Sequence, residues 1–215
     1  MNAVEYLKLG LRHQRDPFFV KYLKGKQLLD IGSGRGEFLA HDPAKFVGVD
    51  IDPELVAECQ RSGLSAHTMS VLALDFADAS FDVVHAAQLI EHFSPNEAVM
   101  LLSEASRVLR PGGIVFLTTP GVANVWNTFS HIRPYPPDSF RKLLKSDTEN
   151  YIRKQCLNLS LVGSYGWRRY YPNKVIKLLA NSLDLLIPPS NPIGWTIILR
   201  KIDVSSCDKI EKSNS

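Results

Sequence analysis

The amino-acid sequence predicts an α/β fold in which helices cover both faces of a doubly wound, mostly parallel sheet. Its short apolar runs at 26–31, 46–50, 81–86 and 113–119 are separated by segments with helix signals. Strands that are apolar throughout are typical of a parallel sheet buried on both faces. Their alternation with helices indicates repeated strand–helix–strand units.

Helices are expected between these strands. The segment 95–109 has apolar residues at helical spacing, and the Ser-Pro pair at 94–95 is a typical helix start. The Asp-Pro pair at 52–53 opens another helix, and a further helix is expected between the first two strands. The Pro-Gly-Gly run at 111–113 is expected to end the 95–109 helix before the next strand.

The character of the sequence changes after residue 120. The segment 126–138, WNTFSHIRPYPPD, is rich in aromatic residues and proline and favours an ordered loop at an active site. Two late strands are expected at 157–163 and 194–202. The segment 173–187 is apolar nearly all round as a helix, so it needs cover. Core packing, a dimer surface and a membrane-interface helix all stay open for it.

Length and composition define one domain. The 215 residues, 45% apolar and 22% charged, exclude a disordered or fibrous chain. We expect a single domain over 1–203, beginning with a helical lead-in at 1–25. Substrate-side insertions are expected at 121–156 and 164–193, and a polar tail at 204–215.

Cysteine usage and hydropathy bear on the type of protein. Its 3 cysteines are far apart in the sequence, which excludes a disulfide framework or a zinc knuckle. No clustered His, Cys and Asp spacing indicates a metal, so none is expected. A leader peptide and an apolar run long enough to span a bilayer are both missing, so a cytoplasmic location is expected.

Charge is unevenly distributed. Residues 1–120 hold 11 Lys and Arg against 15 Asp and Glu, whereas residues 121–215 hold 14 against 7. The basic part would attract an anionic acceptor, a phosphate-bearing carrier or an acidic membrane surface. A solvated basic face without a partner is the alternative.

A glycine-rich motif carries the strongest functional signal. In LLDIGSGRGEF, at 28–38, a strand ends in Asp30 and runs into alternate glycines. Glycine lets the backbone turn tightly and approach a ligand closely. A dinucleotide site would need a third motif glycine where Glu37 stands. Carboxylates at Asp30 and Glu37 favour a ligand that is cationic there.

A second acid follows the next strand. Asp50 in FVGVDID, at 46–52, stands where a carboxylate can accept both ribose hydroxyls of a nucleoside. The neighbouring Ile51 would offer an apolar face to a purine. The alternative is that Asp30 and Asp50 only cap helices.

These motifs resemble those of class I S-adenosylmethionine-dependent methyltransferases, in the small-molecule branch that includes type 11 and ubiquinone-biosynthesis-like enzymes. The matching segments are LLDIGSGRGEF, VGVDIDPE, ADASFDVVHAAQLIEHF and RVLRPGGIVFLTTP, and they span about residues 26–120. The resemblance implies a Rossmann-like sheet of seven strands, mostly parallel, with one antiparallel strand near the end. Residues 157–163 and 194–202 would be its last two strands.

The resemblance also implies S-adenosyl-L-methionine as the cofactor. Asp30 and the glycine loop would hold its amino-acid part, while Asp50 and Ile51 would contact the ribose and the adenine. Ser70 replaces the acid that the family usually has for the adenine amino group, which leaves the backbone of Val71. The predicted cofactor-binding residues are Asp30, Gly32, Ser33, Gly34, Gly36, Asp50, Ile51, Ser70, Val71 and, at the methionine end, Gln88.

Methyl transfer from a sulfonium needs alignment and exclusion of water, and it needs a base only if the acceptor starts protonated. His92 and His131 are the predicted catalytic residues. A packing or capping role is the alternative for His92, and Glu91 carries the same ambiguity. His85, within an apolar strand, is expected to be a buried histidine with hydrogen-bond partners. The predicted acceptor-binding residues are Arg133, Tyr135 and Trp167.

The sequence therefore predicts a methyltransferase that acts on a small-molecule, lipid or glycan-precursor acceptor of anionic or amphipathic character. Oxygen is the first choice of acceptor atom and carbon the second. A non-catalytic cofactor-binding scaffold and an RNA-modifying enzyme stay open. No stable nucleic-acid partner is expected, because no RNA-binding module accompanies the domain. Peripheral membrane contact or a homodimer would involve 173–187.

Overall fold

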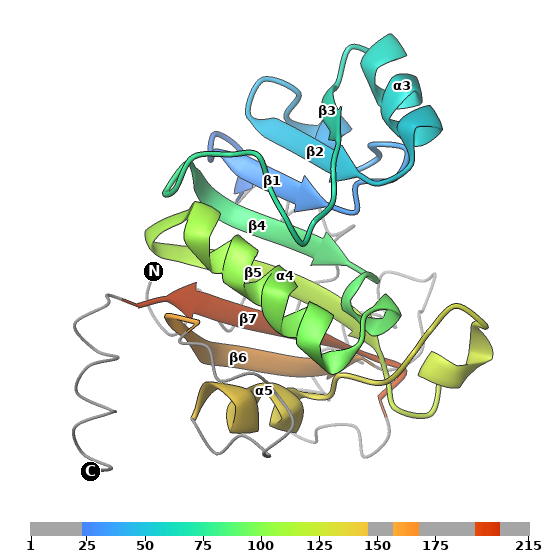
Figure 1. Cartoon of the computed structure of the whole chain (residues 1–215), viewed down its shortest axis with the longest axis vertical. Coiled ribbons are helices and arrows are strands. Elements are labelled where there is room, and N and C mark those ends of the chain that lie inside the picture. Colours follow the sequence, from blue (N-terminus) through green and yellow to red (C-terminus); the bar gives the residue numbers. More distant parts are fainter. Residues whose placement is uncertain (1–22, 146–156, 168–191, 203–215) are drawn as a thin grey trace, which may run out of the picture.

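The computed structural model describes residues 23–145, 157–167 and 192–202. These residues form a 7-stranded sheet in the order β3-β2-β1-β4-β5-β7-β6 (Figure 1). The strands are β1 (Leu28–Ile31), β2 (Phe46–Asp50), β3 (Ser65–Thr68), β4 (Phe81–Ala87), β5 (Leu109–Pro120), β6 (Leu159–Trp167) and β7 (Gly194–Lys201).

The sheet is mostly parallel, as the sequence predicted. Strands β1 to β5 pair in parallel, while β7 runs antiparallel to both of its neighbours, β5 and β6. The strand order reverses direction between β1 and β4. In an open parallel sheet, ligands bind outside the carboxyl ends of the strands at such a point.

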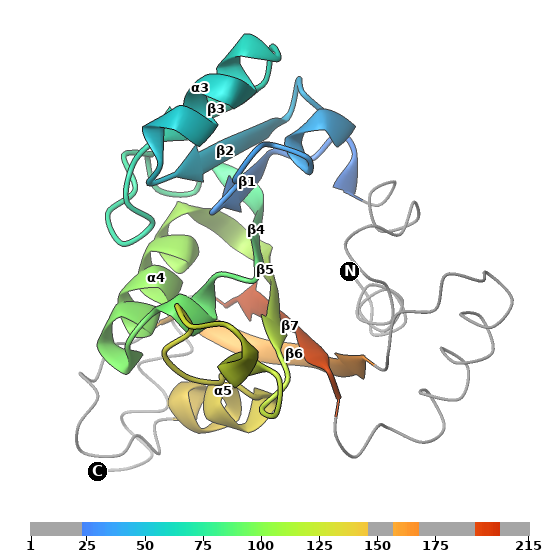
Figure 2. The same ribbon diagram turned by 90° about the vertical axis from the view of Figure 1, so that its right-hand side faces the viewer.

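Helices cover both faces of the sheet. The α-helices are α3 (Pro53–Arg61), α4 (Pro95–Val108) and α5 (Pro137–Leu144), and the short 3-10 turns are η1 (Leu39–His41), η2 (Ile90–His92) and η3 (Val125–Asn127). Helices α4 and α5 lie along one side of the sheet (Figure 2) and share one apolar cluster. Residues of α3 and η1 belong to the cluster on the other face.

The two predicted helix starts are confirmed, and side chains explain both. Ser94 and Glu97 form a reciprocal capping box at the start of α4. The Asp52 carboxylate accepts from the amides of Glu54 and Leu55 at the start of α3. Proline at the first helical position supports each start, because its missing amide has no partner to lose there.

The helix expected between β1 and β2 is absent, and that prediction was wrong. The described chain has only the turn η1 at this place. Three glycines at positive φ occupy 32–36, and the Asp-Pro pair at 42–43 follows closely. Because a residue before proline disfavours the helical conformation, too few residues are left for a full helix.

The Pro-Gly-Gly run also differs from its predicted role. Helix α4 ends at Val108, and β5 begins directly at Leu109, before the run. The pairing with β4 shifts from Leu109 opposite Phe81 to Ile114 opposite Val83. Residues 110–113 therefore form an irregularity within the paired strand, where Gly112 adopts a positive φ.

Several predictions concern residues outside the described ranges. These are most of the lead-in at 1–25, the helix at 173–187 with its proposed membrane or dimer contact, and the tail at 204–215. Among the helices that are described, none has the length and apolar content needed to cross a bilayer.

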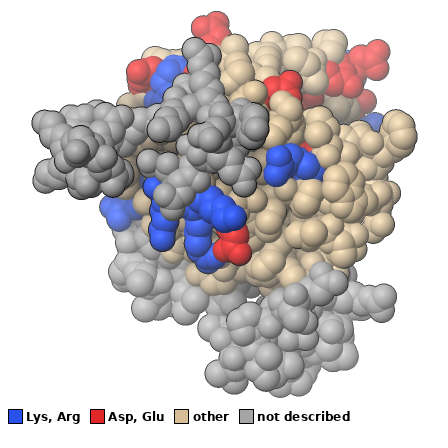
Figure 3. Space-filling model, turned by 60° about the horizontal axis from the view of Figure 1, so that its bottom comes forward, with Lys and Arg blue, Asp and Glu red and all other residues tan. Residues whose placement is uncertain are grey.

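On the face shown in Figure 3, Lys and Arg side chains gather in places, with acidic side chains mostly along the upper rim.

Arg107, near the end of α4, holds the chain between β3 and β4. Its guanidinium donates to the backbone carbonyls of Leu74 and Phe76. It also pairs with the carboxylates of Glu104 and Asp78. Glu104 accepts from the Leu74 amide at 2.7 Å. Hydrogen bonding to Arg107 is the main reason that the pKa of Glu104 lies below its ordinary value of 4.5.

Replacing Arg107 with alanine should lower the free energy of unfolding by about 2–3 kcal/mol at neutral pH, because it removes charge-assisted hydrogen bonds to partly buried groups. Since the pKa of Glu104 is lowered by folding, its contribution is complete above pH 4.5 and is lost as the pH falls below that value. Urea unfolding at pH 7 and well below pH 4.5 measures both effects.

The matched control is Arg110→Ala, which removes a more exposed cation paired with Asp82. It should cost at most about 1 kcal/mol. Equal losses for the two variants, or a loss in Arg107→Ala that does not shrink at acid pH, would contradict the assigned role.

Candidate functional site

The glycine loop follows β1 at the carboxyl edge of the sheet. The amides of Gly32 and Ser33 donate to the carbonyl of Val49, at 2.8 and 3.0 Å, which anchors the loop to β2. Gly34 has a φ of +53°, and a Cβ built there would meet no atom of the described residues within 4 Å. The loop is thus held from behind, and its backbone at Gly34 is open to a ligand.

Asp50, at the end of β2, orients this loop. Its Oδ2 accepts from the Gly34 amide at 2.9 Å, and its Oδ1 accepts from the Asp52 amide at 3.1 Å. Each carboxylate oxygen keeps a second lone pair for a ligand hydroxyl. The next residue, Ile51, is 73% exposed and presents an apolar surface beside the carboxylate. Contact of Asp50 with a ribose and of Ile51 with its base stays a prediction.

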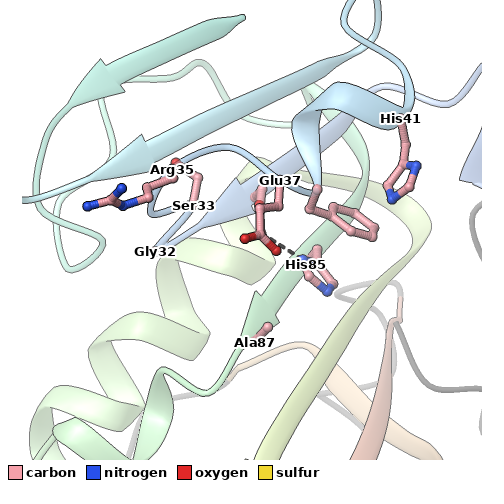
Figure 4. A pocket seen from close by; sticks show the side chains of 9 residues that line it. Gly32, Ser33, Arg35, Glu37, His41, His85 and Ala87 are labelled. Atoms are coloured by element: carbon pink, nitrogen blue, oxygen red, sulfur yellow. Dashed lines mark hydrogen bonds and ion pairs between the residues drawn. The ribbon is translucent and has the colours of Figure 1, made fainter. Parts of the chain in front are cut away.

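A cavity of about 500 Å³ opens beside the loop. Figure 4 shows Ser33 and Glu37 on one side of it and His85 on another. Its lining residues are Asp30, Gly32, Ser33, Arg35, Glu37, Phe38, His41, His85 and Ala87. The acidic groups in this lining suit a ligand that carries positive charge.

Asp30 and His85 form a buried pair at the floor of this cavity. The Asp30 Oδ1 lies 2.6 Å from the His85 Nδ1, and their side chains are only 5% and 2% exposed. The imidazole also stacks on Phe38, with ring centroids 4.0 Å apart. The prediction that His85 is a buried histidine with a partner is confirmed. The Asp30 carboxylate is therefore held in place by His85, and its contact with a cofactor stays a prediction.

The other predicted cofactor-binding residues lie along the same edge. The Ser70 hydroxyl accepts from the Leu72 amide at 3.2 Å, and Val71 is buried. Gln88 is exposed just after β4 and has a φ of +52°, a strained conformation for a residue other than glycine. Its amide donates to the Thr118 carbonyl at 2.9 Å. Their roles toward a cofactor stay predictions.

The two predicted catalytic histidines lie together, although 39 positions separate them in the sequence. The rings of His92 and His131 meet edge to face, with centroids 4.7 Å apart. Glu91 joins them, since its Oε1 is 4.0 Å from the His131 Nε2. We call these three residues the Glu-His-His cluster. It lies at the carboxyl ends of β4 and β5, on the side where an acceptor would approach.

Glu91 is fully buried. Burial raises the pKa of its carboxyl, an effect opposed by its own backbone amide, by Thr119 and by His131. Within the described residues, neither carboxylate oxygen nor the Thr119 hydroxyl makes a hydrogen bond of ordinary geometry. Thr119 thus acts on the Glu91 carboxyl as a polar neighbour.

The predicted acceptor-binding residues have different surroundings. Tyr135 is buried, and its hydroxyl donates to the Phe93 carbonyl at 2.8 Å, so that group is already engaged. Arg133 is exposed and lies over the Tyr135 ring at 5.3 Å. Trp167 ends β6 at the ligand edge and donates to Thr196 at 2.9 Å. Acceptor binding by these residues stays a prediction.

The fold and the glycine loop have the arrangement found in class I S-adenosylmethionine-dependent methyltransferases. Residues 29–117 match the family model described as a methyltransferase domain. The match covers less than half of the chain, and it supports a methyltransferase of the class I type 11 kind with S-adenosylmethionine as its cofactor. The acid-lined cavity and the open backbone at Gly34 fit the cationic methionine end of that molecule.

The relatives are distant. The chain is 32% identical over 114 residues to a ubiquinone biosynthesis O-methyltransferase of Rhizobium etli, which covers 49% of this chain and 45% of that protein. A mouse tRNA (carboxymethyluridine) methyltransferase is 33% identical over 108 residues, or 47% of this chain and 16% of that protein. The chain thus spans less than half the length of these curated relatives.

Solved structures share the fold over most of the chain. A SAM-dependent methyltransferase from Archaeoglobus fulgidus superposes with a TM-score of 0.64 at 19% identity, covering 86% of this chain and 90% of that one. One from Methanosarcina mazei has a TM-score of 0.60 at 16% identity and covers 87% and 98%. At such low identity the likeness concerns the fold alone.

The Asp30–His85 pair gives a prediction about stability. Replacing His85 with leucine should lower the free energy of unfolding by about 3 kcal/mol or more, because it leaves a buried carboxylate without its partner. Adding Asp30→Asn should recover part of that loss, since the buried group is then neutral. Urea unfolding of both single variants and the double variant measures the coupling. Additive effects would contradict a direct pair.

Proposed function

We propose that this protein transfers a methyl group from S-adenosylmethionine to an oxygen atom of a small amphipathic acceptor. The observation that carries the proposal is the meeting of two elements at one edge of the sheet. The glycine loop with Asp50 lies at the ends of β1 and β2, and the Glu-His-His cluster lies at the ends of β4 and β5. One element suits the cofactor, and the other suits a protic acceptor.

The bound cofactor supplies an activated methyl group on a positively charged sulfur. The chain's own residues have three tasks: to fix the cofactor, to align the acceptor and to favour loss of its proton. The acceptor oxygen bonds to the methyl carbon as the carbon–sulfur bond breaks, which gives a methyl ether and S-adenosylhomocysteine. The acceptor's proton leaves at the Glu-His-His cluster, where His92 is half-buried and reachable.

Exposed apolar side chains support an amphipathic acceptor. Trp126, Phe129 and Ile132 follow β5 and are 62%, 107% and 49% exposed. Arg133 stands next to them and is exposed as well. An acceptor with an apolar body and an anionic group would complement this set. The O-methyltransferase name of the Rhizobium etli relative also favours oxygen, with carbon as the second choice.

RNA modification is the second candidate, favoured by the tRNA methyltransferase among the relatives and by the basic residues after position 120. Binding carried by phosphate contacts would weaken steeply with salt. Retention of tRNA that is lost as salt is added, together with methylation of that tRNA, would replace the small-molecule proposal.

The cofactor half of the proposal is tested by calorimetry with S-adenosylmethionine and S-adenosylhomocysteine. Asp50→Asn should weaken binding of both by roughly 10- to 100-fold, because charge-assisted hydrogen bonds to a hydroxyl are worth about 1.5–3 kcal/mol. Asp52→Asn is the matched control. It removes a carboxylate two residues away yet keeps a good helix cap, so it should bind like the wild type.

Absence of binding by the folded protein, or equal weakening in the two variants, would argue against this site. Absence of binding would also argue against the alternative of a non-catalytic scaffold that binds the cofactor.

The acceptor half is tested by release of S-adenosylhomocysteine with a panel of phenols, hydroxylated lipids and phosphorylated glycan precursors. An amphipathic acceptor should be methylated, and Phe129→Ser should raise the acceptor KM several-fold with little change in cofactor affinity. Met100→Ser, an exposed apolar position on α4, is the control and should change neither. If the two variants have the same acceptor KM, the exposed apolar side chains after β5 do not bind the acceptor.

A further inference from the structure

The Glu-His-His cluster brings together three side chains of the kinds that bind metal ions. Glu91 and His92 come from η2, and His131 comes from the segment after η3. One potential ligand atom of each lies within 4.8 Å of the others. Two imidazoles and one carboxylate form a recognised ligand set for divalent transition metals.

The buried carboxylate of Glu91 points to a missing cation. Its side chain is 0% exposed, and neither oxygen has a hydrogen-bond partner among the described residues. A buried carboxylate without partners is strongly disfavoured as an anion. The Nε2 of His131 lies 4.0 Å from the Glu91 Oε1, too far for a hydrogen bond. A cation between the three side chains would satisfy both oxygens.

The hydrogen bonds of the two histidines favour the same conclusion. The Nδ1 of His131 lies 2.7 Å from the Val125 carbonyl, and the Nδ1 of His92 lies 3.2 Å from the Ser130 carbonyl. A carbonyl only accepts, so both Nδ1 atoms carry the proton. Each Nε2 then keeps its lone pair for a metal. Metal-binding histidines commonly have their second nitrogen held in this way.

We infer that Glu91, His92 and His131 form a binding site for a divalent transition-metal ion such as Zn²⁺. Imidazole nitrogen favours such ions, whereas Mg²⁺ favours oxygen ligands alone. Donor atoms around tetrahedral Zn²⁺ are about 3.3 Å apart, as follows from metal–ligand distances near 2.05 Å. The Glu91 and His131 donors, which are 4.0 Å apart, must therefore close by about 0.7 Å when the ion binds, and no pair in the cluster must close by more than about 1.5 Å.

The role of this ion rests on the proposed function. Three protein ligands leave a coordination position open, as in catalytic metal sites, and half-buried His92 gives access to it. An acceptor hydroxyl bound there would lose its proton to solvent more easily, since a metal lowers the pKa of a bound hydroxyl. The resulting oxygen anion would attack the methyl carbon as the carbon–sulfur bond breaks. The two histidines would then be ligands, and neither would act as a base.

The test uses the full, untagged chain, freed of metal with a chelator and desalted. Titration with Zn²⁺ by calorimetry, and with Co²⁺ by visible absorption, should show one site per chain. Mg²⁺ should bind far more weakly. Glu91→Gln and His131→Gln should each weaken Zn²⁺ binding at least about 100-fold, since even second-layer partners of metal ligands are worth 10- to 100-fold.

His67→Gln is the matched control, because it removes an exposed histidine on β3. It should bind Zn²⁺ like the wild type. Glu91→Gln should fold normally, since a neutral amide replaces a buried carboxylate, and retained S-adenosylmethionine binding checks this. If that variant unfolds, His131→Gln and His92→Gln carry the test. Absence of saturable binding, variants that bind like the wild type, or tighter binding of Mg²⁺ than of Zn²⁺ would overturn the inference.

Metal binding and methyl transfer are measured separately, so their failures can be told apart. Loss of methyl transfer after chelation, with recovery on adding Zn²⁺, supports the assigned role. Full methyl transfer by the metal-free protein would overturn that role. A histidine of the cluster would then remove the acceptor's proton as a base. One tight site in a protein that binds no S-adenosylmethionine would instead contradict the proposed function.

Discussion

The contact on which the site depends is the buried pair between Asp30 and His85. These two residues are direct neighbours across β1 and β4, where the strand order of the sheet reverses. A slip of one position would move every side chain of a strand to the other face and separate the pair. The pair thus favours one register. That register sets the glycine loop level with the segment from Gln88 to His92.

At the carboxyl edge of the sheet, the two sides of the Asp30–His85 pair carry different groups. Toward β2, backbone amides and Asp50 form a rigid, acidic surface suited to a cationic nucleoside. On the side toward β5, the chain leaves β4 at Gln88, which has a strained backbone conformation, and then enters the tight turn η2. That turn places Glu91 against the segment that follows β5. There the backbone amide of Ile132 donates to the backbone carbonyl of Glu91 at 2.8 Å.

Much of this arrangement could be predicted from the sequence, because uniformly apolar strands and helix-start pairs are local signals. The strands at β1, β2, β4, β5 and β7 were predicted nearly in place. Strand β3, Ser65–Thr68, was missed, since it is a mostly exposed edge strand with only Ala66 buried. Helix α5 was missed because it follows a proline-rich segment without a capping side chain. Neither element has a strong pattern of its own.

The Glu-His-His cluster shows where local signals end. The sequence indicates His92 and His131 as candidate catalytic residues, but it does not show that their rings and the Glu91 carboxylate meet, because that depends on how the chain returns after β5. The burial of Glu91 could not be predicted from the sequence either, since a Glu-His pair after a strand is typical of a solvent-exposed turn. Only the fold shows that this carboxylate, which has no hydrogen-bond partner among the described residues, lies beside two oriented imidazoles. A charge that is costly to bury and poorly paired is evidence for a ligand, because the folded chain otherwise gains nothing from keeping it there.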